Sequence, residues 1–172
     1  VSRIEFQNNR LVVNYMEVRS AIAEWNAAED RFVLTTGTQG VHSAQKILSK
    51  VFKIGSDKLR VVTPDVGGGF GPKAFVYREY ALVMEAAKRL GRPVKWTSDR
   101  NEQFLVDAQG RDNYSVGEMA LDERGRFLGL RVRLIANMGA YISQYAADIP
   151  RIRGAMSTGV CDIEALFVET IG

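Results

Sequence analysis

The chain has 172 residues, of which 46% are hydrophobic and 25% charged, an ordinary composition for a globular protein. Its 23 basic and 20 acidic residues give a net charge of +3, too small and too evenly spread to indicate a nucleic-acid-binding protein. No apolar run reaches the roughly 18 residues of a membrane span, and one cysteine with one histidine cannot form a disulfide framework or a structural zinc site.

The cysteine content and the two ends of the chain give two further expectations. Cys161 is the only cysteine, which suits a reducing compartment, so we expect a cytoplasmic protein. The chain begins with Val1, and residues 167–172 are typical of a strand that has been cut short. We therefore expect a piece of a longer polypeptide.

The first part of the chain predicts a strand–helix–strand unit. Residues 19–25 and 31–36 are β-like runs separated by a turn at 26–30. From Val41 onward the apolar residues recur at helical spacing, and Gly55 is a plausible end for that helix. A short β-branched run then ends at Pro64.

A glycine-rich loop follows this second predicted strand. It contains Gly67, Gly68, Gly69 and Gly71, with Phe70 as the single large residue among them. Glycine leaves the backbone N–H groups accessible to a ligand, and the helix predicted over 74–90 would add a partial positive charge at its N-terminus.

Two familiar phosphate-binding motifs do not match this loop. Counting from Gly67, Pro72 stands where the dinucleotide-binding fingerprint needs its third glycine. The P-loop needs glycine before Lys-Ser/Thr, whereas Lys73 lies between Pro72 and Ala74. A lysine at a helix start is unfavourable unless it meets an anion, so Lys73 is predicted either to contact a phosphate or to be solvated.

The second part of the chain predicts a further strand at 93–97, a brief helix capped by Ser98 or Asp99, and a β-hairpin. The hairpin joins 114–121 to 127–136 with Gly125 in the left-handed conformation, and its alternation indicates one buried face and one solvated face carrying Arg131 and Arg133. We predict an α+β fold with a mixed β-sheet and two main helices. It would form a single partial domain over 1–172, with possible sub-units at 9–66 and 67–172.

Several motifs in order resemble one known family. They are Thr36-Gly37-Thr38-Gln39, Gly67-Gly68-Gly69-Phe70-Gly71-Pro72-Lys73, Gly91-Arg92-Pro93-Val94-Lys95-Trp96, Asp99-Arg100, Gly110-Arg111-Asp112 and Asn137-Met138-Gly139-Ala140-Tyr141. From about Asn9 to its end the chain is similar to the molybdenum-binding subunits of the xanthine dehydrogenase family, most of all to the large chains of aerobic carbon monoxide dehydrogenases. The resemblance implies one lobe of a larger molybdopterin-binding domain.

The resemblance also implies roles for particular residues. Backbone groups of the glycine loop and the Gln39 amide would contact the oxo group and the pterin, and a second backbone contact would come from Gly139 and Ala140. In the loop these residues are Gly68, Gly69, Phe70 and Gly71. Amide N–H groups can hydrogen-bond an oxo ligand without coordinating the metal, so we expect no direct protein ligand. By a looser alignment, Arg151 and Arg153 would face the substrate.

The family's other parts are expected outside these residues. The proton-abstracting glutamate and the substrate-specificity loop would lie downstream of Gly172, so the fragment alone is expected to be inactive. The cofactor would be molybdopterin, in its cytosine dinucleotide form, and iron–sulfur clusters and FAD would lie on partner subunits of an oligomeric complex. Where the xanthine and aldehyde branches usually carry glycine, lysine and glutamate, this chain has Pro72, Lys73 and Ala74, and the missing carboxylate disfavours purine substrates.

Three other interpretations stay open at this point. The chain could belong to an aldehyde or N-heterocycle oxidoreductase of the same family. It could be a non-catalytic phosphate- or nucleotide-binding module that uses the loop and Lys73. It could also be a purely structural domain, in which the glycines serve only tight packing.

Overall fold

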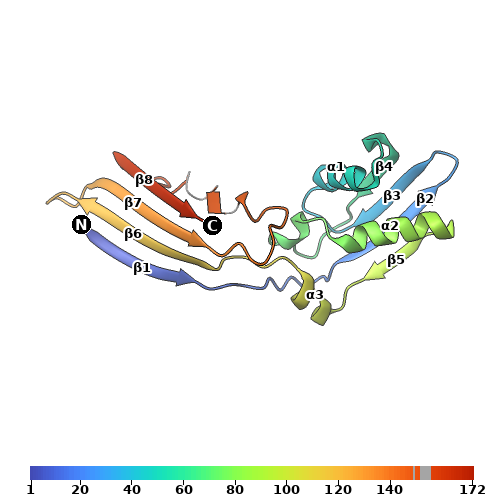
Figure 1. Ribbon diagram of the computed structural model, residues 1–172, viewed down its shortest axis with the longest axis horizontal. Coiled ribbons are helices and arrows are strands. Elements are labelled where there is room, and N and C mark those ends of the chain that lie inside the picture. Colours follow the sequence, from blue (N-terminus) through green and yellow to red (C-terminus); the bar gives the residue numbers. More distant parts are fainter. Residues whose placement is uncertain (149, 152–155) are drawn as a thin grey trace. The chain divides into compact units, whose positions relative to one another are not determined.

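The computed structural model describes residues 1–148, 150–151 and 156–172, and these form two compact units. Unit 1 comprises Val1–Leu11 and Gln109–Gly172, and unit 2 comprises Val12–Ala108. Each unit contains a four-stranded mixed β-sheet (Figure 1). The division therefore differs from one between residues 66 and 67, because the first strand of the chain pairs with a strand more than a hundred residues later.

The sheet of unit 2 contains the predicted strand–helix–strand unit. Its strands are β2 (Ser20–Asn26), β3 (Arg31–Thr36), β4 (Leu59–Val62) and β5 (Val94–Thr97), in the order β4-β3-β2-β5. β2 is antiparallel to β3 and β5, whereas β3 and β4 are parallel and joined by helix α1 (Val41–Phe52). A parallel pair needs such a crossover. Because β3 and β4 run in the same direction, both end at the same edge of the sheet.

Helices α1 and α2 (Arg78–Leu90) bury one face of this sheet (Figure 1). Side chains at every second position of β2 and β3 point into the core, as expected for a strand with one covered face. The buried residues of this core are Ala21, Ala23, Phe32, Leu34, Leu48, Leu59, Tyr80, Val83, Met84 and Ala87. The two helices predicted from 3.6-residue spacing are therefore confirmed as the main helices of the chain.

The ends of these helices differ in part from the sequence prediction. α1 ends at Lys53, whose backbone is left-handed at φ 54°, and not at Gly55, which is extended. α2 begins at Arg78 instead of residue 74, because Pro72–Ala74 forms a single 3-10 turn and Phe75 is extended after it. The helix N-terminus that we expected directly after the glycine loop is thus displaced from it. The predicted end of α2 is confirmed by left-handed Gly91.

Helix α3 (Arg100–Val106) is the last helix of unit 2, and Asp99 caps its N-terminus. The Asp99 carboxylate accepts a hydrogen bond from the backbone N–H of Glu102 at 2.7 Å, which satisfies one of the unpaired donors at a helix start. Of the two predicted caps, Ser98 and Asp99, Asp99 is the one used.

The sheet of unit 1 has the order β1-β6-β7-β8. Its strands are β1 (Ser2–Asn8), β6 (Asn113–Leu121), β7 (Phe127–Ala136) and β8 (Ala165–Ile171). The predicted hairpin is confirmed as β6 and β7, with Gly125 at φ 79° in its turn. β1 was not predicted, because its residues are exposed on an edge strand and carry a mixed pattern of charged and apolar side chains.

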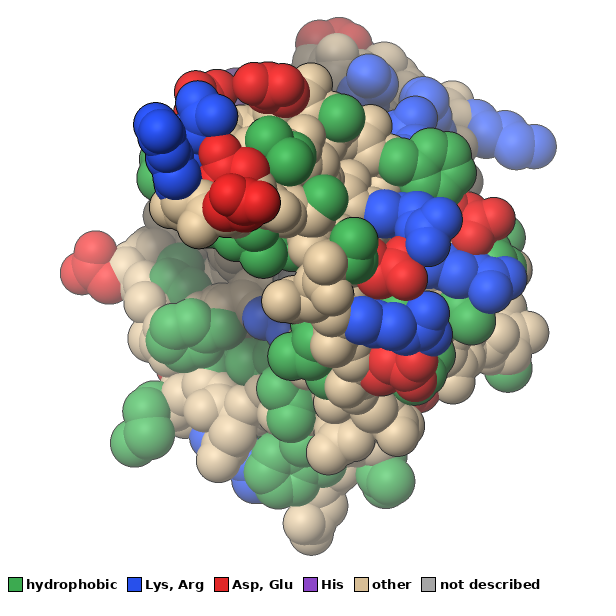
Figure 2. Space-filling model, turned by 90° about the vertical axis from the view of Figure 1, so that its left-hand side faces the viewer, with side chains coloured by type: hydrophobic (Ala, Val, Ile, Leu, Met, Phe, Trp, Pro, Cys, Tyr) green, Lys and Arg blue, Asp and Glu red, His purple; other side chains and the backbone are tan. Residues whose placement is uncertain are grey.

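Alternation gives the sheet of unit 1 a charged face and an apolar face. Arg3, Glu118 and Arg131 lie opposite one another on three neighbouring strands and form ion pairs, and Arg133 pairs with Glu169. Leu130, Val132 and Leu134 are half-buried on the other face, while Leu128 at the strand's start is 39% exposed. Figure 2 shows basic and acidic side chains lying side by side among hydrophobic ones on one face.

Candidate functional site

Gln39 and the glycine loop both follow the ends of parallel strands. Gln39 lies three residues after β3, and the loop from Gly67 to Gly71 comes after neighbouring β4. Because these strands are parallel and adjacent, the segments that leave them start from the same edge of the sheet. This carboxyl edge is where open α/β sheets place their ligand sites.

Hydrogen bonds join Gln39 to the loop. The Gly71 backbone N–H donates to Gln39 Oε1 at 2.9 Å, and the Gln39 backbone N–H donates to the Lys73 carbonyl at 3.0 Å. A Cβ atom at Gly69 would lie 2.7 Å from Gln39 Oε1, so only glycine allows this approach. The sequence prediction that Gln39 and the loop converge therefore agrees with the structure. The Gly71 N–H is bonded to Gln39, however, and so is not free to donate to a ligand.

Phe70 has an unusual backbone conformation and an exposed side chain. It has a left-handed backbone at φ 47°, which is uncommon outside glycine, and 75% of the residue is exposed. Its ring turns back over Gly68, where an added Cβ would lie 2.9 Å from the Phe70 ring. A non-glycine residue held in this conformation is the kind of backbone strain found at ligand sites.

Three donors at this place have no hydrogen-bond partner within the described part of the chain. They are the side-chain Nε2 of Gln39 and the backbone N–H groups of Gly69 and Phe70. All are neutral N–H groups, and the Gln39 side chain lies against Gly69 and is bonded to Gly71, the two neighbours of Phe70 in the chain. They could donate to oxygen atoms of a ligand without coordinating a metal.

Lys73 does not behave as either sequence interpretation predicted. It is 1% exposed, and its Nζ lies 2.5 Å from Glu17 Oε2 and 4.7 Å from the centre of the Tyr15 ring. Lys73 is thus neither a solvated lysine nor a cation at the start of a helix, because a protein carboxylate already neutralises it. The interpretation as a phosphate-binding module loses both of its positive elements, the free lysine and the adjacent helix N-terminus.

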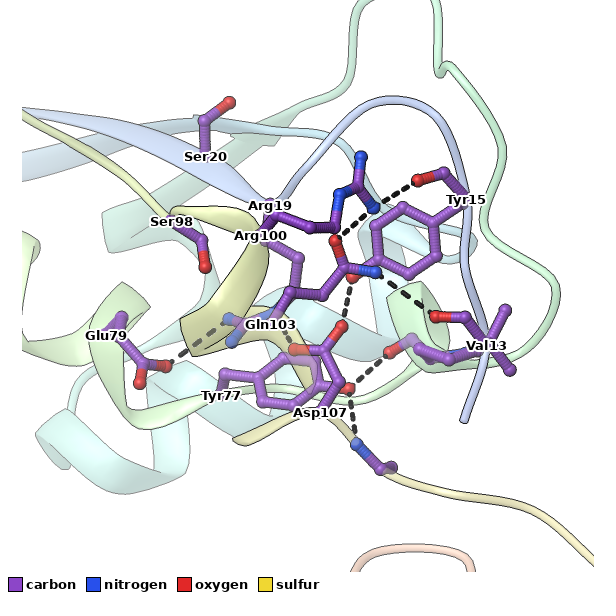
Figure 3. A network of polar contacts seen from close by, with 12 residues as sticks. Val13, Tyr15, Arg19, Ser20, Tyr77, Glu79, Ser98, Arg100, Gln103 and Asp107 are labelled. Carbon is purple, nitrogen blue, oxygen red and sulfur yellow. Dashed lines mark hydrogen bonds and ion pairs between the residues drawn. The ribbon is translucent and has the colours of Figure 1, made fainter. Parts of the chain in front are cut away.

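A buried polar network supports the segment before β2 (Figure 3). Arg19 Nε donates to Asp107 Oδ1 at 2.6 Å, and the Tyr15 hydroxyl donates to the other oxygen of Asp107. The Arg19 guanidinium also stacks on the Tyr77 ring, 3.7 Å from its centre. Burial, together with the hydrogen bond to Asp107, raises the pKa of Tyr15 far above its usual range, so this hydroxyl stays protonated.

Helix α3 holds the same segment through side chains that reach its carbonyl groups. Arg100 donates to the Tyr15 carbonyl at 2.6 Å, and Gln103 Nε2 donates to the Val13 carbonyl at 3.2 Å (Figure 3). Arg100 also donates to the Met16 carbonyl at 2.7 Å. The residue next in the chain is Glu17, which contacts the glycine loop. α3 therefore stabilises, through residues 13–16, the segment that supports the candidate site.

The second predicted backbone contact, Gly139 and Ala140, belongs to unit 1, whereas Gln39 and the glycine loop belong to unit 2. Gly139 has φ 76°, and its N–H donates to Asn137 Oδ1 at 2.9 Å. Asn137 Nδ2 in turn donates to the carboxylate of Asp112 at 2.8 Å. The backbone at Gly139 is thus held by a side-chain amide, as is the backbone at Gly71.

Sequence reasoning missed the ion pairs that support the site. Glu17, Arg19 and Asp107 were not singled out, although a signal exists: Glu17 and Arg19 interrupt the apolar residues just before β2.

Two arginines were predicted to face the substrate. Arg151 pairs with Asp148 at 2.8 Å. Arg153 lies outside the described residues. Among the described residues there is no group of three or more His, Cys, Asp or Glu that could hold a metal ion, and no helix long and apolar enough to cross a membrane.

Comparisons with known proteins identify related chains. Residues 1–172 match the family described as the molybdopterin cofactor-binding domain. The chain is 32% identical over 163 residues to the nicotine 6-hydroxylase large subunit of Paenarthrobacter nicotinovorans, covering 93% of this chain and 20% of that one. It is 36% identical over 126 residues to the carbon monoxide dehydrogenase large chain of Hydrogenophaga pseudoflava, covering 73% and 16%.

The fold is also similar to a solved structure. Quinoline 2-oxidoreductase from Pseudomonas putida 86 superposes with a TM-score of 0.87 at 33% identity, covering 99% of this chain and 22% of that one. The chain thus spans about a fifth of the length of the relatives it matches.

Proposed function

Because the chain belongs to the molybdopterin cofactor-binding domain family, we propose that Gln39 and the loop Gly68–Gly71 form part of the molybdopterin site of a molybdenum-dependent oxidoreductase. The observation that carries the proposal is the hydrogen bond between Gly71 and Gln39, which brings the loop and a side-chain amide to one place. Gly139 and Ala140 are proposed to add a further backbone contact.

The residues present fit such a cofactor in their chemistry. The Nε2 of Gln39 and the N–H groups of Gly69 and Phe70 have no partner among the described residues, and Gly69 has no Cβ to fill the space next to Gln39. Neutral donors suit oxygen atoms that carry partial negative charge. Because the loop and the amide are already tied together, these donors need little rearrangement when charge develops on a bound oxygen atom.

The contribution of these residues is to bind and to orient. When bound, the molybdenum cofactor supplies the two-electron chemistry by which a water-derived oxygen is added to a substrate carbon. The exposed ring of Phe70, on a strained backbone, would shape the space beside the donors. We assign no general base among these residues and place that role outside the chain.

The whole enzyme is proposed to resemble the large chain of carbon monoxide dehydrogenase, with the cofactor in its cytosine dinucleotide form and with iron–sulfur and FAD subunits as partners in an oligomer. The names of the relatives support a subunit role, since two of them are a large chain and a large subunit. A cytoplasmic location is proposed from the lone Cys161.

A second candidate is an N-heterocycle oxidoreductase of the same family. It is favoured by the relatives named nicotine 6-hydroxylase and quinoline 2-oxidoreductase, which match this chain over 93% and 99% of its length. Ala74, at the position where the resemblance implies a glutamate in the xanthine and aldehyde branches, argues against purines within this class. An aldehyde substrate is the remaining option.

The test uses the complete protein, purified with its partner subunits from cells grown with molybdate. Metal analysis and a fluorescent pterin assay measure the cofactor, and carbon monoxide, an aldehyde and quinoline are then offered with an electron-accepting dye. The proposal expects molybdenum and pterin together, and dye reduction with one of the three substrates. A protein that contains no pterin and binds a free nucleotide would contradict it.

A further inference from the structure

The glycine loop is fixed at both ends by one carboxylate oxygen. Glu17 Oε2 accepts a hydrogen bond from the Gly67 backbone N–H at 2.9 Å and lies 2.5 Å from Lys73 Nζ. The Glu17 backbone N–H also donates to the Gly67 carbonyl at 3.1 Å. Gly67 and Lys73 begin and end the segment that contains Gly69, Phe70 and Gly71.

The ion pair is built into the protein and is not a chance surface contact. The Lys73 side chain is 1% exposed, and a buried ammonium group is costly unless a negative charge neutralises it. The Glu17 side chain is 39% exposed, so it approaches the loop from the solvent side. A Cβ on Gly67 would lie 2.5 Å from the Glu17 Cβ, so the two backbones are in close contact.

The contacts that Glu17 makes with Gly67 and Lys73 are linked to Gln39 through the backbone of Lys73. The Lys73 carbonyl accepts hydrogen bonds from the Gln39 backbone N–H and from Thr38 Oγ1, both at 3.0 Å. A displacement of Lys73 would therefore move the backbone of Gln39, whose side chain holds Gly71. The contacts form a continuous path from Glu17 to Gln39.

We propose that Glu17 is a positioning residue for the cofactor site: by holding Gly67 and Lys73 together, it fixes the loop in the conformation in which the free donors of Gly69, Phe70 and Gln39 lie together. Glu17 itself is not a catalytic residue, since its carboxylate is occupied by the loop. This inference rests on the proposed function for its link to the cofactor, and on geometry alone for its link to the loop.

The experiment compares the unmodified complete protein with Glu17→Gln and with the control Glu85→Gln. Glu85 pairs with Arg89 at 2.6 Å on the exposed side of α2, so the control also removes one carboxylate from an ion pair of unit 2. Hydrogen–deuterium exchange is followed by mass spectrometry in peptides covering 67–76 and 36–41 of cofactor-free protein. Pterin content and melting temperature are measured on the protein as purified.

In Glu17→Gln the two peptides are expected to exchange about tenfold faster, which is the effect of losing one charge-assisted hydrogen bond. Pterin content falls with it, while Glu85→Gln matches the unmodified protein in both measurements. Unchanged exchange in Glu17→Gln overturns the proposal, and so does faster exchange with unchanged pterin content.

A second variant, Lys73→Met, covers the case in which Glu17→Gln does not fold. It removes the buried charge and leaves Glu17 free to hold Gly67, so the fold tolerates it. We expect faster exchange in 36–41 and less pterin; unchanged values in both overturn the proposal. If the unmodified protein contains no pterin, the proposed function fails instead, and the exchange measurement still decides whether Glu17 holds the loop.

Discussion

Gln39 and Gly71, 32 positions apart in the chain, are joined by a hydrogen bond of 2.9 Å between the Gln39 side-chain oxygen and the Gly71 backbone N–H. This bond fixes the orientation of the Gln39 amide, because the oxygen faces the loop and the Nε2 group is left free. It therefore sets which atoms a ligand at this place would meet.

A methyl group at Gly69 should disrupt this relationship. In Gly69→Ala the added Cβ would lie 2.7 Å from Gln39 Oε1, so the side chain of Gln39 must move and its bond to Gly71 is lost. We expect a loss of about 1 kcal/mol in the free energy of unfolding and a marked loss of bound pterin. Urea unfolding and a pterin assay check this.

The control for that variant is Gly117→Ala, where the nearest atom to the added Cβ is Ile4 Cγ2 at an ordinary 3.5 Å. We expect a change in unfolding free energy of at most about 0.5 kcal/mol and normal pterin content. Equal pterin loss in the two variants would show that Gly69 has no special role.

The buried pair of Arg19 and Asp107 should dominate the stability of unit 2. Both side chains are at most 1% exposed, so Arg19→Met leaves a buried carboxylate without its partner. We expect a loss of about 3 kcal/mol or more in the free energy of unfolding, measured by urea titration. The double variant Arg19→Met with Asp107→Leu should recover much of it, because the buried carboxylate of Asp107 is removed together with its partner; the weaker contact of Arg19 with Glu79, at 3.4 Å, stays lost.

The exposed pair of Arg89 and Glu85 provides the comparison. The Arg89 side chain is 77% exposed, so Arg89→Met should cost no more than about 0.5 kcal/mol. A similar loss in Arg89→Met and Arg19→Met would argue against a structural role for the network behind the loop.

Stability should fall in acid partly through Glu17. The hydrogen bond from Lys73 lowers the pKa of Glu17 below its ordinary value of 4.5, so in acid the unfolded chain takes up this proton before the folded one. The contribution of Glu17 is therefore present above pH 4.5 and is lost as the pH falls through the lower, folded-state pKa. Unfolding free energies measured from pH 6 to pH 3 should decline more steeply for the unmodified protein than for Glu17→Gln. Parallel curves would contradict this assignment.

Removal of the N-cap of α3 should lower the stability of the protein modestly. Asp99→Ala loses the acceptor for the Glu102 N–H and should cost about 1 kcal/mol, whereas Asp99→Asn keeps an acceptor and should cost much less. Circular dichroism during thermal unfolding measures both. Equal losses would mean that the cap contributes through charge and not through the hydrogen bond.

Local patterns predicted the elements of the chain but not the contacts between them. The helical spacing before Phe52 and the alternation from Leu130 to Leu134 each follow from one covered face, so α1 and the β6–β7 hairpin could be predicted. β1 could not be, because an exposed edge strand has no strict pattern. The start of α2 was placed too early because Pro72–Ala74 forms a separate 3-10 turn and Phe75 is extended after it.

The arrangement of the candidate site could be predicted only in part for a similar reason. Gln39 and the glycine loop could be found because their residue types are unusual and their order resembles a family. The support from Glu17 could not, since pairing it with Lys73 requires two segments 56 positions apart to be placed side by side. A buried lysine and a solvated one look alike in sequence.

The convergence of Gln39 with the loop is tested most directly by the cofactor content of Gln39→Leu. Gln45→Leu is the matched control, because Gln45 Nε2 donates to the Ser56 and Leu59 carbonyls at 2.9 and 2.7 Å in the same unit and has no contact with the loop. Molybdenum and pterin per chain are measured in the complete protein at equal folded fraction. We predict that Gln39→Leu loses most of its cofactor while Gln45→Leu keeps it; full cofactor content in Gln39→Leu would contradict the account.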